Sequence, residues 1–200
     1  MEVSRISKTA ATVDKIIKVL RSLALAAAIC VLIMIPLVLI FGEEMIKLTP
    51  EVYLGNVEMT LTGDPASYLD MGKLKACITI ALAVAAVELA FVWYALKILR
   101  EILSPMKEGR PFERGVSEKI RRLGWITLIG GAILEVANVI ASKFELAAYD
   151  LTTIFSSNVE KVESVARINL WFVIAALILV FLAYIFNYGE QLQKESDETL

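Results

Sequence analysis

The sequence predicts an all-α membrane protein, a four-transmembrane-helix bundle with a small extracytoplasmic cap. Hydrophobic residues make up 58% of its 200 residues, against about 45–50% in ordinary soluble domains. A hydrocarbon core of about 30 Å takes roughly 20 helical residues to cross. Four apolar stretches reach or approach that length, at 22–41, 74–99, 123–141 and 168–188. We therefore expect residues 1–200 to form a single four-span membrane domain.

The basic residues predict the orientation of these spans. Five lie in the segment 1–21, seven in the loop 100–122 and one in the tail 189–200, whereas the other two connections, together with Lys75 at the start of the second span, hold six. Loops rich in lysine and arginine stay in the cytoplasm. The protein is thus expected to be a multi-pass protein of the cytoplasmic membrane, with both termini and the middle loop inside.

The first 21 residues form an amphipathic pattern. Apolar residues recur three and four apart, as on one face of a helix. This segment is either a charged flank that sets the topology or a helix that binds lipid or a partner. The following span, 22–41, exceeds the 7–15 apolar residues of a signal peptide, so we expect it to be retained. The apolar residues of the amphipathic pattern in the segment 1–21 are Ile6, Ala10, Val13, Ile17 and Leu20.

The outer loops 42–73 and 142–167 are expected to form the cap. In the first loop, Val52 and Leu54 alternate with polar residues before Gly55-Asn56, and Val57 and Met59 alternate after it. A Gly-Asn pair suits a two-residue hairpin turn, so a short β-hairpin is predicted. The second loop is long for a structureless link, which favours short helices.

Several functional classes are excluded by missing residues. The chain has no Walker-type glycine loop, no dinucleotide fingerprint and no zincin or thiol-pair motif. It also has no histidine, which rules out a histidine-dependent triad and removes the commonest metal ligand. A net charge of −2 gives no general attraction to nucleic acid. We therefore predict no catalytic residues, no metal, no cofactor, no enzymatic activity and no direct binding of nucleic acid.

Two carboxylates interrupt the apolar spans, Glu88 in the second and Glu135 in the third. They lie 12 and 13 residues from Arg100 and Arg122, which mark the cytoplasmic ends of those spans. At about 1.5 Å per residue, both acids lie about 18–20 Å along their helices. Two acids on consecutive antiparallel spans are then level with each other.

Small and polar residues share the helix stripes of these acids, so we expect both acids, with Asn138, to face the interior of the bundle. A charge at this depth is costly, and two acids in contact hold at least one proton between them. One interpretation is a site that binds a proton or cation. The other is a protonated glutamate that bonds to Asn138 or to a backbone carbonyl and holds two helices in register.

Pro105 and the segment 109–111 are expected to stop the helix of the second span, and Gly189 marks a break after the fourth.

The middle loop and the tail also resemble a known family. The carrying residues of the middle loop are Gly109, Pro111, Phe112, Arg121, Arg122 and Gly124, and those of the tail are Phe186, Gly189, Leu192, Gln193, Glu195, Asp197, Glu198, Thr199 and Leu200. They resemble the YoaS-like bacterial four-span integral membrane proteins, a family of unknown function. The resemblance covers the whole chain in architecture and is specific over about 35 residues. Where that family usually has an asparagine after its Pro-Phe pair, this chain has Gly115-Val116.

The resemblance implies a partner on the cytoplasmic side, because members are often encoded beside a small Cro-like helix-turn-helix regulator. The residues expected to bind this partner are Gly109, Pro111, Phe112, Arg121, Arg122, Gly189, Leu192, Gln193, Glu195, Asp197 and Thr199. It implies no catalytic residues. The acidic tail is either a solvated surface, or a segment that docks on a basic partner or on its own middle loop. The leading hypothesis is a sensor or regulatory protein acting through such contacts, with a homodimer as a further expectation. The alternative is a small transporter, or a proton- or cation-binding protein, that uses Glu88 and Glu135.

Overall fold

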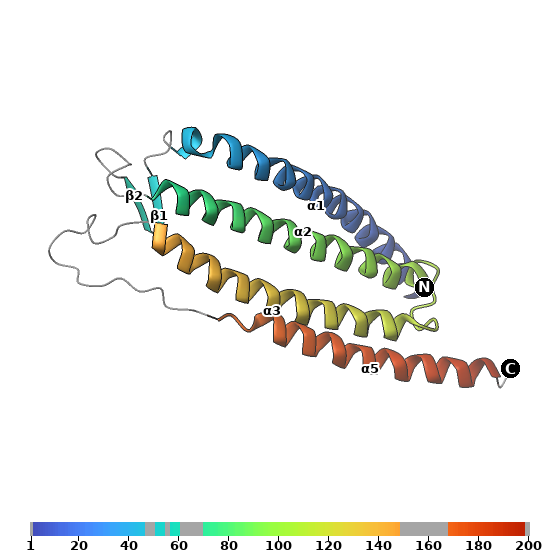
Figure 1. Ribbon diagram of the computed structural model, residues 1–200. Coiled ribbons are helices and arrows are strands. Elements are labelled where there is room, and N and C mark those ends of the chain that lie inside the picture. Colours follow the sequence, from blue (N-terminus) through green and yellow to red (C-terminus); the bar gives the residue numbers. More distant parts are fainter. Residues whose placement is uncertain (1, 47–50, 55–56, 61–69, 149–167, 199–200) are drawn as a thin grey trace. The chain divides into compact units, whose positions relative to one another are not determined.

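The computed structural model describes residues 2–46, 51–54, 57–60, 70–148 and 168–198. Long helices dominate this part of the chain, and two short strands follow the first helix (Figure 1). The elements are α1 (Glu2–Ile46), β1 (Glu51–Leu54), β2 (Val57–Thr60), α2 (Met71–Lys107), α3 (Val116–Ala148) and α5 (Trp171–Glu198).

The predicted fold class is confirmed. In the described part of the chain four helices are long and apolar enough to cross a membrane, and at most 11% of the apolar window of each is buried inside the protein. Large side chains such as Ile40, Leu177 and Phe181 stay 64–69% exposed. Side chains of this kind are covered by lipid rather than water. The chain is a multi-pass membrane protein.

The predicted hairpin is confirmed as well. Strands β1 and β2 pair antiparallel, from Leu54 opposite Val57 to Glu51 opposite Thr60. The two residues between the strands, 55–56, lie outside the described residues. The helices expected in the second outer loop fall mostly on residues 149–167, which also lie outside them. Helix α3 itself continues to Ala148, past the end of the predicted span at residue 141.

The helices extend beyond the predicted spans at other places too. Helix α1 joins the segment 1–21 to the first span and continues through Pro36. Helix α5 continues through Gly189 to Glu198, so the predicted tail begins as helix rather than as a break in it. The helices continue into charged and polar residues where the apolar stretches end. They can do so because each backbone hydrogen bond of a helix joins residues only four positions apart.

The chain divides into two compact units. Unit 1 comprises 1–28, 87–134 and 169–200, and unit 2 comprises 29–86 and 135–168. In unit 2, Leu74 and Ala148 are buried together, and the backbone amide of Asp70 donates a 2.9 Å hydrogen bond to the carbonyl of Ala148. This contact joins the start of α2 to the end of α3.

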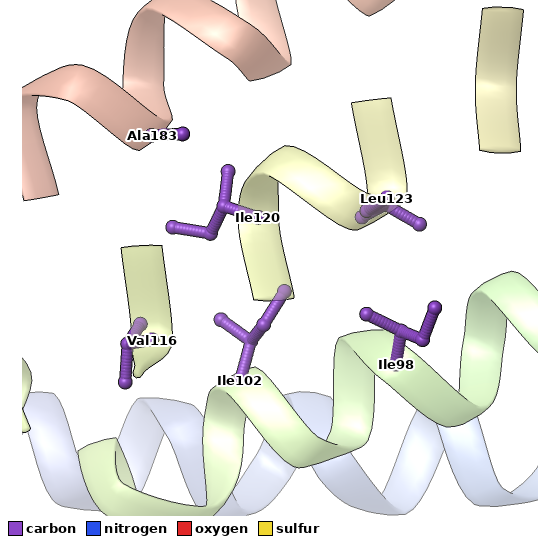
Figure 2. Packing of buried hydrophobic residues seen from close by; sticks show 6 residues of the cluster. All are labelled: Ile98, Ile102, Val116, Ile120, Leu123 and Ala183. Carbon is purple, nitrogen blue, oxygen red and sulfur yellow. The ribbon is translucent and has the colours of Figure 1, made fainter. Parts of the chain in front are cut away.

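Unit 1 contains the main hydrophobic cluster. Figure 2 shows the isoleucines of α2 pointing towards the side chains of α3, with Ala183 of α5 nearby. Much of this cluster lies beyond the apolar stretches, where lipid ends and burial from water stabilises packing at about 25 cal/mol per Å². The cluster therefore holds α2, α3 and α5 together in unit 1. Its buried members are Ile98, Ile102, Val116, Ile120, Leu123 and Ala183.

Candidate functional site

The link between α2 and α3, residues 108–115, is a defined turn. The amide of Arg110 donates a hydrogen bond to the carbonyl of Pro105 at 2.9 Å, and the amide of Gly109 donates one to the carbonyl of Met106 at 3.1 Å. This pair of bonds is the Schellman pattern that ends a helix, and it needs a left-handed residue, here Gly109 at φ 79°. The glycine thus stops α2 as predicted, while Pro105 lies inside its last turn.

The start of α3 is capped by a residue far away in the sequence. The carboxylate of Glu190, on α5, accepts hydrogen bonds from the backbone amides of Gly115 at 3.3 Å and Ser117 at 2.7 Å. The first amides of a helix have no partner within the helix, and its amino end favours a negative charge. Glu190 therefore fastens α5 to the link.

Phe112 makes the second contact between the link and α5. Its ring centroid lies 5.4 Å from that of Phe186. A Cβ built on Gly189 would lie only 2.5 Å from the ring of Phe112, so only glycine allows this approach. Three residues of the predicted partner-binding set, Gly109, Phe112 and Gly189, thus belong to the link or to its contact with α5. Pro111, between the first two in the sequence, is half-buried.

The rest of the predicted partner-binding set is more scattered. Arg121 is exposed on α3, and Arg122 bonds to the hydroxyl of Tyr94 on α2. On α5, Leu192 and Glu195 are exposed and Gln193 is half-buried. The side chain of Asp197 and all of Thr199 lie outside the described residues.

A groove of about 590 Å³ runs between the link and the end of α5. Most of its charges are already paired: Arg110 contacts Glu108 and Glu113, and Lys194 contacts Glu198 at 3.6 Å. The hydrogen bond to Glu108 raises the pKa of Arg110 above its ordinary value, and the charge of Glu113 adds to the effect. The lining residues are Arg110, Phe112, Glu113, Arg114, Asn187, Glu190, Gln191, Gln193, Lys194 and Glu198.

An ion-pair cluster ties α1 to α2 in the same unit. The carboxylate of Asp14 lies 2.8 Å from Nε of Arg100 and 3.1 Å from Nζ of Lys107, and Ser7 donates a hydrogen bond to the carbonyl of Lys107. Sequence reasoning missed this cluster. The signal was present, because Asp14 is an acid among the basic residues of a segment expected to be cationic.

Asp14 lies eight residues before the apolar stretch that begins at Ser22. The hydrogen bond from Arg100, and a second from Lys107, lower the pKa of Asp14 below its ordinary value, against the opposing effect of burial. The carboxylate is 15% exposed. It stays ionised and holds two cations of α2 against α1.

A second contact between α1 and α2 is a cation–π pair. The guanidinium of Arg21 lies 4.3 Å from the ring centroid of Trp93. Such a pair contributes about 0.5–1 kcal/mol at exposed sites and more where water is excluded. It attaches the end of the amphipathic segment to the second span.

The intramembrane acids are placed differently from the prediction. Glu88 and Asn138 are exposed rather than turned to the interior, and Glu135 is half-buried and has an interaction partner. Around α2, Glu88 lies about 80° from the buried Ile98 and about 40° from the buried Ile102. Glu88 belongs to unit 1 and Glu135 to unit 2, so a contact between them stays a prediction.

Among the described residues, no group of three or more histidine, cysteine, aspartate or glutamate side chains is arranged to hold a metal ion. The candidate site is the link 108–115 together with the end of α5, which are joined by the contacts of Glu190 and Phe112. No family model matches the chain, and no curated protein or solved structure matches it at a significant level.

Proposed function

We propose that this multi-pass membrane protein is a sensor or regulatory protein that acts by binding a protein partner, not by catalysis. The binding surface is formed by the link 108–115 and the last turns of α5, residues 190–198. This surface is held in one arrangement by Glu190, by the Phe112–Phe186 contact and by the close approach at Gly189. A preformed surface binds with less loss of conformational entropy than a flexible one.

One observation carries the proposal. Phe112 is fixed against α5 and is still 38% exposed beside the groove, and Leu192 on α5 is 48% exposed. An exposed aromatic side chain that lines a groove is a typical anchor for a partner, and Leu192 lies between the groove residues Gln191 and Gln193 in the sequence. The groove and its rim belong to the water-facing part of the helices, since they follow the apolar stretch that ends at residue 188.

The proposed partner is a small helix-turn-helix regulator, as the family resemblance implies. DNA-binding proteins of this kind are basic, and the last turns of α5 present the exposed acids Glu195 and Glu198. The proposal requires the link and both termini to face the cytoplasm, as the distribution of basic residues predicts. A fluorescent protein fused after residue 200 tests this orientation: fluorescence supports it, and a dark fusion with an active periplasmic reporter contradicts it.

The proposal predicts that a small helix-turn-helix protein is encoded beside this gene, and the binding test uses that protein and the purified membrane protein in detergent. We expect binding by the wild type and at least tenfold weaker binding by the variant Leu192→Glu, since loss of an anchor costs more than about 1.4 kcal/mol. The control Thr12→Glu introduces the same charge at an exposed position of α1, outside the proposed surface, and should bind like the wild type. Equal affinity of Leu192→Glu and wild type, or no binding by the wild type, contradicts the proposal.

A second candidate function is proton or cation binding within the membrane. It is favoured by Glu88, which lies within the apolar stretch 74–99 and has no hydrogen bond or ion pair in the described part of the chain. Ionisable side chains inside membrane spans are costly and usually serve a function.

A further inference from the structure

A second cavity, of about 330 Å³, lies between the first turns of α3 and the α5 helix, within unit 1. It is distinct from the apolar contact at Phe112, which does not line it. Arg114 and Arg121 line one part of the cavity, and Tyr184 and Asn187 of α5 line another. Two cationic side chains and two neutral hydrogen-bonding side chains thus share one cavity.

The two arginines are not used by the fold. Both are exposed, and neither has an ion pair or hydrogen bond among the described residues. The other arginines near this end of unit 1 do have partners: Arg100 pairs with Asp14, Arg110 with Glu113, and Arg122 with Tyr94. Arg114 and Arg121 therefore remain available to an anion.

Two carboxylates also line the cavity. Both oxygens of Glu190 already accept bonds from the amides of Gly115 and Ser117, and these amides offset its charge. Glu118 is the remaining acid, and it is exposed. The sum of two free arginines and one free carboxylate is a charge of about +1, which matches a ligand with a single negative charge.

The position of the cavity along the helices indicates the source of that anion. Arg121 stands two residues before the apolar stretch 123–141, and Asn187 lies at the end of the stretch 168–188. The wall formed by Val180 and Ala183 continues into the apolar part of α5. From Asn187 to Val180 is seven residues, or about 10 Å of helix. The cavity is polar at the lipid–water boundary and apolar towards the hydrocarbon.

We propose that this cavity binds the phosphodiester of a membrane phospholipid. Guanidinium groups bind phosphate oxygens with two parallel hydrogen bonds, and basic pockets between membrane helices hold lipid headgroups. Arg114 and Arg121 contact the phosphate oxygens, the Tyr184 hydroxyl and the Asn187 amide supply further donors, and an acyl chain lies along Val180 and Ala183. Glu118 disfavours a phosphomonoester, which carries a second negative charge, and favours the singly charged diester.

The test is native mass spectrometry of the purified protein in detergent with added dioleoyl phosphatidylglycerol, dioleoyl phosphatidylethanolamine or inorganic phosphate. We expect both lipids to bind, and the variant Arg114→Gln/Arg121→Gln to bind each at least tenfold more weakly. The matched control, Lys97→Gln/Lys143→Gln, removes the same charge from exposed positions of α2 and α3 and should change the affinity less than twofold. Equal loss in the two double variants would show a diffuse charge effect and overturn the proposal.

Two further measurements keep the result from being ambiguous. Glu118→Gln removes the opposing carboxylate and should bind phosphatidylglycerol two- to threefold more tightly, an effect that a damaged fold cannot produce. Unchanged or weaker binding counts against the cavity. Displacement of both lipids by millimolar inorganic phosphate would identify a free phosphate as the ligand and would also overturn the lipid assignment. Arg114 also lines the groove of the proposed partner, whereas Arg121 and Glu118 line only the cavity. The single variants Arg121→Gln and Glu118→Gln therefore separate lipid binding from the partner-binding test, and unchanged lipid binding by Arg121→Gln counts against the cavity.

Discussion

The carboxylate of Glu190 accepts a 2.7 Å hydrogen bond from the backbone amide of Ser117, across 73 residues of sequence. This contact caps α3 with a side chain from α5. It joins the two segments that carry the family resemblance. The conformation of the link 108–115 therefore depends on a residue near the end of α5.

The first prediction concerns this cap. Replacing Glu190 by alanine leaves the amides of Gly115 and Ser117 without acceptors, and loss of a helix cap costs about 0.5–2 kcal/mol. We expect faster hydrogen exchange of the amides of residues 115–118 and a lower melting temperature, with Glu190→Gln intermediate. The control is Glu44→Gln, an exposed acid in unit 2. Exchange rates at residues 115–118 that match the wild type would show that the cap is not formed.

The second prediction concerns the close approach at Gly189. In Gly189→Ala the new methyl group overlaps the ring of Phe112, and overpacking of this kind costs about 1–3 kcal/mol. We expect thermal unfolding at a lower temperature in detergent. The matched control is Gly72→Ala, where the nearest atom, Oδ1 of Asp70, is 3.4 Å from the new Cβ. The smaller, non-aromatic side chain in Phe112→Leu should reduce the cost of Gly189→Ala, and strictly additive effects would contradict the contact.

The third prediction is the pH dependence of the Asp14 cluster. Because the pKa of Asp14 is lowered in the folded protein, chiefly by Arg100, its stabilising effect is complete above the unfolded value of about 3.9. The effect is lost as the pH falls through the lower, folded value. We expect the difference in melting temperature between wild type and Asp14→Asn to be constant from about pH 5 upwards and to shrink below about pH 4. A difference in melting temperature that grows as the pH falls would contradict a stabilising effect of this ion pair.

The fourth prediction separates the two interpretations of the intramembrane acids. Glu88 is exposed and unpaired in the described part of the chain, so Glu88→Gln should keep the stability within about 0.5 kcal/mol. Glu135 has a partner, so Glu135→Gln should lower the stability. If the acids bind protons or cations, pH-dependent flux in proteoliposomes disappears in the double variant. Flux or pH response that persists there rules out the second candidate function.

The sequence by itself determined those features that depend on neighbouring residues. The four spans follow from the length of each apolar stretch, and the hairpin follows from alternation around Gly55-Asn56. The end of α2 near Gly109 follows from a glycine, which readily adopts the left-handed conformation of a helix end, and from the proline two residues later. Each of these depends on local backbone geometry or on summed hydropathy, so no distant residue has to be known.

Only the tertiary structure decided which faces pack and which charges meet. In the sequence Gly189 indicates a break in the helix, but α5 continues through it. The absence of a side chain at Gly189 instead allows the ring of Phe112 to lie close to α5. The pairing of Asp14 with Arg100 and the exposure of Glu88 also depend on helix rotation. Residues at one depth can face lipid or protein according to a rotation of less than a quarter turn, since Glu88 lies only about 40–80° around α2 from the buried Ile102 and Ile98. That angle is set by packing between helices, which the pattern of a single helix does not contain.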